Sequence, residues 1–278
     1  MPEDYMEIGF VTDEISSDIK EAIEIGVSWG ISKYELRVVG KNRIPDIDAT
    51  RIRQIQELIK RHNVQITALS PGMLKGALQD AAEIEREINE TLPATFALAQ
   101  KFETDKVIVF GFHRSEADHP NDKQRVIDYF GRVAESAEAR GLIIAVENEP
   151  GFWCDTGENT ARILATVNSP ALRANWDPGN AVGTDEPPFP DGYYALKDWI
   201  SNVHIKDTVK GALVECVPVG EGLVDWPGQL RAIVQERPVE HMTIETHCLP
   251  LIEKSKQNLR VVKELIAAAT RRGEAPQI

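Results

Sequence analysis

The 278-residue sequence contains little cysteine, and its cysteines suggest neither a disulfide framework nor a thiolate metal site. Three occur, Cys154, Cys216 and Cys248, widely separated and without a Cys-x-x-Cys pair. Such sparse thiols favour a reducing compartment. The sequence also starts MPEDYMEIGF, where no basic region precedes a long apolar run of the kind found in secretory signals. We therefore expect a cytoplasmic protein with reduced thiols.

Long apolar runs and excess basic charge are missing as well. No segment approaches the ~18 continuous apolar residues of a membrane-spanning helix. The 31 lysines and arginines are outnumbered by 44 aspartates and glutamates, which gives a formal net charge of −13. Excess negative charge repels phosphate backbones and anionic lipids. We expect a small-molecule partner and neither a nucleic acid nor a membrane, while the formation of a homo-oligomer stays open.

A glycine-rich turn for nucleotide binding is also absent. An open doubly wound sheet would carry Gly-x-Gly-x-x-Gly after its first strand, but that place reads FVTDEISSD. What the sequence does contain is an alternation of short β-rich runs with amphipathic stretches, in units of roughly 33 residues that match strand, loop and crossover helix. The runs end near Thr12, Leu36, Leu69, Phe110, Glu147, Asp177, Lys206 and Glu245.

Helical patterns fill the intervals between these runs. They cover residues 18–26, 48–62, 80–100, 122–140, 156–167, 193–200, 226–235 and 251–271. Alternation of this kind indicates a parallel sheet, and eight units without a linker indicate a closed barrel. The sequence therefore predicts a single (β/α)8 TIM barrel that occupies residues 1–278 as one domain.

Four residues that can bind metals lie at matching places in four consecutive units. Glu147 closes the run LIIAVE, Asp177 closes LRANWD, His204 lies in NVHIKD, and Glu245 closes HMTIE. The carboxyl ends of barrel strands all point to one rim, where active sites of this fold are built. A single such carboxylate is more often a helix cap or an ion pair, and a single histidine is usually a satisfied polar residue. Four at matched positions predict one shared site.

The composition of this set points to a divalent cation. Three carboxylates packed together would raise one another's pKa unless a cation lay among them. Three oxygen ligands and one imidazole favour Mn²⁺, Mg²⁺ or Co²⁺, with Zn²⁺ also possible. Four protein ligands leave two positions of an octahedron for a neighbouring carbonyl and hydroxyl of a substrate.

In its motifs the chain resembles the xylose isomerase-like barrels. The matching segments are VENEP, NWDPGN, HIKD, TIETH and VGEGLVDW, in this order over nearly the whole length. The resemblance is to the sugar phosphate isomerase/epimerase group, with its tagatose 3-epimerase-like, hydroxypyruvate isomerase-like and inosose isomerase-like enzymes. It implies that all four residues bind the metal and that Glu147 and Glu245 also form the catalytic acid/base pair. The expected activity is isomerisation or epimerisation of a small sugar, ketose or cyclic polyol ketone through an enediolate.

Three other functions remain as alternatives. A metal-dependent dehydratase, similar to inosose or 3-dehydroshikimate dehydratases, would expel a β-hydroxyl from the same enolate. An endonuclease IV-like nuclease would need further histidines, and Asn180 stands where one of them belongs. A barrel that binds ligands without turnover is the third possibility.

Four further residues are predicted to contact the substrate: His113, Asn180, Lys206 and Asp207. Lys206 shares the barrel-facing side with His204 by strand alternation, although a structural ion pair with Glu147 or Asp177 is an equal alternative. Asp207 could instead cap or orient a neighbour, and His113 could be a surface residue.

The predicted substrate carries no phosphate. The loop after the eighth strand, THCLPLIEK, lacks a glycine-rich turn, and barrel phosphate sites usually arise near the last two strands. Lys206, Lys210 and Arg37 are the evident cations near the predicted rim, and for Arg37 a surface ion pair is favoured over an anion contact.

Overall fold

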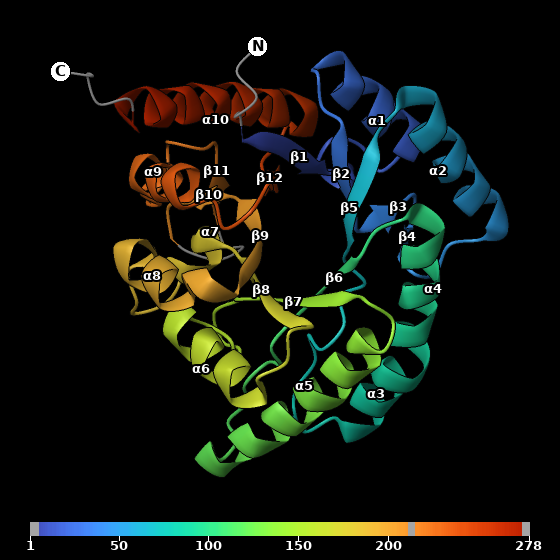
Figure 1. Ribbon diagram of the computed structural model, residues 1–278, viewed down its shortest axis with the longest axis vertical. Coiled ribbons are helices and arrows are strands. Elements are labelled where there is room, and N and C mark those ends of the chain that lie inside the picture. The colour runs from blue at the N-terminus through green and yellow to red at the C-terminus, as the bar shows by residue number, and fades with distance from the viewer. Residues whose placement is uncertain (1–5, 211–214, 274–278) are drawn as a thin grey trace.

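Eight parallel strands form a closed ring in the computed structural model, which describes residues 6–210 and 215–273. Their order is β1, β2, β5, β6, β7, β8, β9 and β12, and β12 pairs with β1 to close the barrel (Figure 1). The strands are β1 (Glu7–Val11), β2 (Lys33–Leu36), β5 (Gln65–Leu69), β6 (Lys106–Val109), β7 (Ile143–Glu147), β8 (Leu172–Trp176), β9 (Ile200–Ile205) and β12 (His241–Ile244). Each ends within one residue of its predicted end, so the predicted (β/α)8 barrel is confirmed.

Most of the helices surround the ring on its outside, whereas the one-turn helix Pro178–Ala181 follows β8 at the end of the barrel where the strands terminate (Figure 1). The helices are α1 (Ile19–Ser28), α2 (Ala49–His62), α3 (Ala81–Arg86), α4 (Leu92–Phe102), α5 (Lys123–Glu138), α6 (Gly157–Val167), α7 (Pro178–Ala181), α8 (Tyr193–Leu196), α9 (Trp226–Glu236) and α10 (Leu251–Gly273). The single helix expected over residues 80–100 is in fact α3 and α4, joined by a π-helical turn at Glu87–Thr91. The helix expected over 193–200 is shorter because a 3-10 turn at Lys197–Trp199 leads directly into β9.

Two short hairpins extend the loops at the carboxyl ends of the strands. One joins β3 (Val38–Val39) to β4 (Asn42–Arg43), and the other joins β10 (Asp207–Thr208) to β11 (Cys216–Val217). The first hairpin follows β2 and the second follows β9. Both therefore lie at the end of the barrel where the strands terminate, which we call the mouth; the opposite end is the floor.

The main core lies between the barrel and its helices. Trp176, Trp226, Phe130 and Tyr34 are buried completely or nearly so in it, as expected for helices that pack their apolar faces on a sheet. Inside the barrel the residues change character along the axis. A small apolar cluster of Ala68, Ile108 and Ala145 is followed toward the mouth by buried polar side chains.

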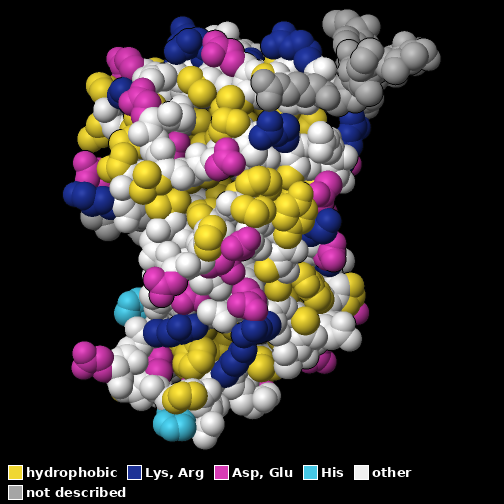
Figure 2. Space-filling view, turned by 90° about the vertical axis from the view of Figure 1, so that its left-hand side faces the viewer, with side chains coloured by type: hydrophobic (Ala, Val, Ile, Leu, Met, Phe, Trp, Pro, Cys, Tyr) yellow, Lys and Arg dark blue, Asp and Glu magenta, His cyan; other side chains and the backbone are white. Residues whose placement is uncertain are grey.

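The surface shown in Figure 2 carries charges of both signs scattered among apolar side chains, without a continuous basic area. Within the described ranges, no helix is both long and apolar enough to cross a bilayer.

Candidate metal centre at the barrel mouth

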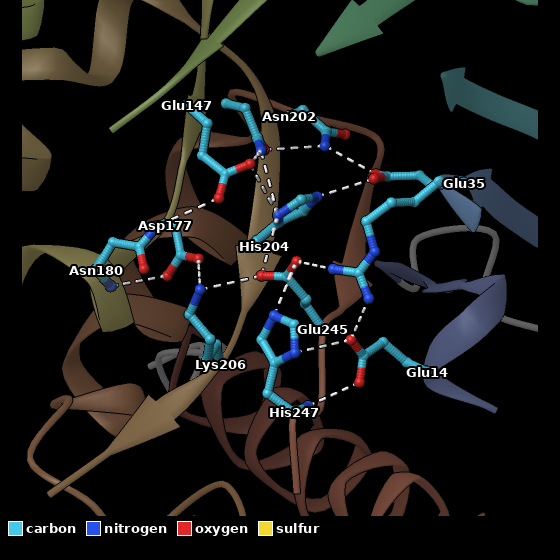
Figure 3. A network of polar contacts seen from close by, with 12 residues as sticks. Glu14, Glu35, Glu147, Asp177, Asn180, Asn202, His204, Lys206, Glu245 and His247 are labelled. Atoms are coloured by element: carbon cyan, nitrogen blue, oxygen red, sulfur yellow. Dashed lines mark hydrogen bonds and ion pairs between the residues drawn. The ribbon is translucent and has the colours of Figure 1, made fainter. Parts of the chain in front are cut away.

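The four predicted metal ligands meet at the barrel mouth (Figure 3). Glu147, Asp177, His204 and Glu245 are all buried, and one ligand atom from each lies within 4.8 Å of the others. His204 Nδ1 is 3.6 Å from Glu147 Oε2 and 3.6 Å from Glu245 Oε2. Two atoms each about 2.1 Å from one ion, at angles of about 90–120°, lie roughly 3.0–3.6 Å apart. The spacing therefore fits a single divalent ion.

The ring of His204 is oriented for metal binding by a carboxylate behind it. Glu35, at the end of β2, places Oε2 2.8 Å from His204 Nε2, and Asn202 donates a hydrogen bond of 2.8 Å to its other oxygen. Burial opposes ionisation of Glu35, but the adjacent His204 outweighs it and lowers the pKa of Glu35 to about 2. Without an ion, the carboxylates of Glu35, Glu147 and Glu245 outweigh burial and raise the pKa of His204. A bound cation would take the lone pair of Nδ1 from the neutral ring, while Nε2–H is donated to Glu35. Metal-binding histidines usually have this arrangement.

A buried lysine stands among the same carboxylates. Lys206 Nζ lies 2.6 Å from Asp177 Oδ2 and 3.0 Å from Glu245 Oε2, with the lysine side chain 1% exposed. The ion pair with Asp177, one of the two alternatives for Lys206, is therefore present. The charges also balance, because three carboxylates, one ammonium and one divalent ion sum to zero when His204 is neutral. Buried charge of this density requires such compensation.

Glu147 receives its hydrogen bonds from neutral amides. Asn175 Nδ2 donates to Oε2 at 3.1 Å, and Asn180 Nδ2 donates to Oε1 at 3.2 Å. Burial, followed by the charge of Glu245, raises the pKa of Glu147 to about 7 although His204 acts in the opposite direction. Without a metal this carboxyl readily holds a proton, and a bound cation would favour its ionised form.

Glu245, in contrast, is surrounded by cations. Arg37 Nη1 donates to Oε1 at 2.6 Å, and His247 Nε2 lies 3.2 Å from the same oxygen. Despite burial, Lys206 and then His247 hold the pKa of Glu245 well below its usual range. Arg37 also pairs with Asp13 at 2.9 Å and with the buried Glu14 at 2.5 Å. The predicted surface ion pair of Arg37 is therefore a largely buried network, and no sequence pattern indicated that Glu14 and His247 belong to it.

Asp207 and His113 differ in their burial and in their contacts. Asp207 is buried, and its carboxylate accepts backbone N–H groups from Thr208, Gly220, Gly222 and Val224. These bonds favour the alternative that Asp207 orients the loop that follows β11. His113 is exposed and packs edge-on against Phe152, with ring centroids 5.5 Å apart. Substrate contact by either residue stays a prediction.

A cavity of about 330 Å³ opens above the ligands. Its wall on the metal side includes Glu147, Glu245, Lys206 and Asn180, so two predicted substrate contacts lie where a substrate would bind. The remaining wall includes two cations that the sequence analysis did not single out, Arg43 and Lys75. They lie in the loops after β2 and β5, where a strand pattern gives no information on side-chain direction.

Comparison with known proteins identifies the same family that the motifs suggested. The family described as xylose isomerase-like TIM barrel matches residues 23–265. A 3-dehydroshikimate dehydratase from Bacillus anthracis is 23% identical over 201 residues, which cover 66% of this chain and 69% of that protein.

Two solved structures show the similarity of the whole fold. An L-ribulose 3-epimerase superposes with a TM-score of 0.77 at 17% identity, over 98% of this chain and 99% of its own. The IOLI protein with a bound zinc atom gives a TM-score of 0.75 at 18% identity, over 96% of this chain and 99% of its own. At such identities the superpositions establish the fold alone.

Proposed function

Because the chain belongs to the xylose isomerase-like TIM barrels, we propose that it is a divalent-metal-dependent isomerase or epimerase. Its substrate is a small sugar, ketose or cyclic polyol ketone. The observation that carries the proposal is the set of four buried ligands with balanced charge, in which His204 is oriented by Glu35. Mn²⁺, Mg²⁺ or Co²⁺ suits the three carboxylates and one imidazole best, and Zn²⁺ also fits this set.

When bound, the ion stabilises the negative charge that develops on the substrate's carbonyl oxygen as an enediolate forms. The chain's own residues then have to move a proton on and off carbon. Glu147 and Glu245 come from strands β7 and β12, which are separated in the ring by β8 and β9. A substrate in the cavity is therefore faced by the two carboxylates from different sides, as one base and one acid require.

The groups next to Glu147 and Glu245 support different roles for the two carboxylates. Glu147 accepts hydrogen bonds from the amides of Asn175 and Asn180, which bind a charged or a protonated carboxyl without a large penalty. Glu245 is fixed by Arg37 and Lys206, which keep it ionised and oriented. We assign Glu245, which is kept ionised, the role of the base that removes the proton from carbon, and Glu147 the role of the acid that returns one from the other side. The two roles exchange in the reverse reaction. Lys206 is placed to donate a hydrogen bond to an oxygen of the substrate.

The experiment that tests this proposal is turnover in D₂O. The Mn²⁺-loaded enzyme is incubated with a panel of ketoses and cyclic ketones and followed by NMR. Deuterium should enter the product at the carbon next to the carbonyl, because a glutamate that exchanges its proton with solvent returns deuterium. Turnover that leaves this carbon fully protonated would contradict the proton-transfer mechanism.

A dehydratase is the second candidate, favoured by the Bacillus anthracis 3-dehydroshikimate dehydratase at 23% identity. The first step would be the same, and Lys206 could donate a proton to the departing hydroxyl. The same NMR panel separates the two functions. A new alkene signal from a cyclic ketone indicates dehydration, whereas deuterium at an intact carbon indicates isomerisation or epimerisation.

A further inference from the structure

Arg43 differs from the other cations at the cavity wall in its partners. It ends the β3–β4 hairpin and donates Nε–H to the backbone oxygen of Ser70 at 3.2 Å. Within the described residues, no carboxylate lies within ion-pair distance of its guanidinium, whereas Arg37 contacts three acidic side chains and Lys75 pairs with Glu149 at 3.0 Å. Arg43 therefore presents to the cavity a positive charge that no described carboxylate pairs with directly, although Asp13, Glu147 and Glu245 act on it at longer range.

The backbone around Arg43 fixes this charge in place. Val38 and Arg43 are paired residues of the hairpin, and Ser70 accepts from the guanidinium on the other side. Gly72 has a φ of +79°, and a Cβ atom there would lie 2.7 Å from Arg43 Nε. The glycine leaves the space that the guanidinium occupies. Arg43 is thus part of a built wall and not a solvated surface side chain.

The charge of this wall matches a singly charged anion. Lys75 lies 4.2 Å from the Phe110 ring centre and is already paired with Glu149, so among the described cations of this wall it is Arg43 that has no directly paired carboxylate. Burial, and next the positive charge of Arg37, lowers the pKa of Arg43. A carboxylate that accepts two parallel N–H groups is the usual partner of a guanidinium in such a position. A phosphate dianion in the same position would keep one negative charge that Arg43 does not compensate.

We propose that the substrate is a polyhydroxylated keto acid whose carboxylate is bound by Arg43 while its carbonyl faces Glu147 and Glu245. The inference rests on the proposed function for the position of the carbonyl. It names the substrate class, either an open-chain keto-uronate or a cyclic polyol that bears a carboxylate. Arg43 would then determine specificity between acidic and neutral sugars.

Binding measurements test the carboxylate separately from catalysis. Quinate and its uncharged methyl ester are titrated calorimetrically into the Mn²⁺-loaded protein and into two variants, Arg43→Gln and the control Arg51→Gln. Arg51 is a half-buried arginine of α2 that donates to Gln54 and does not contribute to the cavity wall. A charge-assisted pair of this kind should favour quinate about ten- to a hundredfold. Arg43→Gln should abolish this preference, and Arg51→Gln should keep it.

The outcomes are distinct for the two proposals. Equal affinity of the unmutated protein for quinate and methyl quinate overturns the inference, whatever the variants do, and so does a preference that survives in Arg43→Gln. A phosphorylated polyol that binds more than about tenfold tighter than quinate also overturns it. Turnover is compared separately for fructuronate and fructose, which differ only at one terminal carbon. If quinate binds through Arg43 but no ketone exchanges deuterium, the inference stands and the proposed function fails.

Discussion

The two ends of the barrel treat buried charge in opposite ways. At the mouth, acidic and basic side chains are in direct contact, as in the pairs of Lys206 with Asp177 and Glu245. At the floor, a larger cavity of about 820 Å³ is lined by Lys106 and His241, neither of which forms an ion pair within the described residues, whereas Lys33 in the same wall pairs with Glu7 at 3.1 Å. Lys106 instead donates to the backbone oxygen of Ser201 at 2.6 Å.

The difference shows in the charge states of these groups. Burial lowers the pKa of Lys106, and burial together with the nearby Lys106 lowers the pKa of His241 to about 4. The floor therefore lowers the pKa of Lys106 and of His241, while the mouth favours the charged forms of Glu245 and Lys206. Cavity size alone would select the wrong end of the molecule. The fixed array of charges at the mouth, with four groups that could hold a cation, is the observation that points to this end as the functional one.

The largest expected effect is on turnover. Replacing Glu147 or Glu245 by glutamine should lower kcat by about a thousandfold or more, because an amide keeps the shape but cannot accept a proton from carbon. The measurement is the initial rate on the substrate found in the D₂O panel, with metal content determined on the same samples. Glu158→Gln, at an exposed position of α6, is the matched control and should be fully active. Full activity in either active-site variant would remove that glutamate from the mechanism.

The second largest effect is expected on metal uptake. After chelation and reloading, elemental analysis should find one equivalent of Mn²⁺ per chain, and Asp177→Ala or His204→Ala should lower this strongly because each removes one of four ligands. Glu240→Gln at the floor should leave the stoichiometry unchanged, since that residue lies in the wall of the other cavity. Uptake by both mouth variants equal to that of the unmutated chain would show that the metal binds elsewhere.

A smaller effect is expected on the affinity for Mn²⁺ when Glu35, which orients His204, is changed. Glu35→Gln keeps a hydrogen-bonding group beside His204 but removes its charge, so Mn²⁺ affinity should fall about ten- to a hundredfold without loss of stoichiometry at saturation. Competition with a fluorescent chelator measures the affinity. Unchanged affinity would mean that Glu35 serves the stability of the barrel interior and not the metal site.

The strand ends and the convergence of the four candidate ligands were predictable because both depend on period and spacing. Glu147, Asp177 and Glu245 close or follow apolar runs, and parallel strands bring such positions to one rim. Glu35 stood at a strand end too, but its pairing with His204 across the barrel depends on the register of β2 and β9, which a sequence pattern does not contain. The orientation of the Arg43 side chain is harder still to predict from the sequence. It depends on the short β3–β4 hairpin and on Gly72, which lies in another loop.

The smallest expected effect concerns stability at the floor. His241 is neutral in the folded protein down to a pKa of about 4, whereas the unfolded chain protonates it below its ordinary value of 6.5. Between these values the unfolded state binds more protons, so His241 lowers the free energy of unfolding as the pH falls from about 6.5 to about 4. His241→Gln packs less well but does not titrate. The loss in unfolding free energy of His241→Gln relative to the unmutated protein should therefore become smaller at low pH.

Urea unfolding at pH 7.0 and pH 4.5 measures this change. We expect the difference in unfolding free energy between the unmutated protein and His241→Gln to decrease by about 2 kcal/mol over this interval. The full shift in pKa would give about 3 kcal/mol, but pH 4.5 lies above the folded-state pKa of His241. The carboxylates of the mouth titrate in both proteins and cancel in the comparison. A difference that stays constant, or grows toward pH 4.5, would mean that His241 is charged in the fold and that the floor, like the mouth, accommodates buried charge.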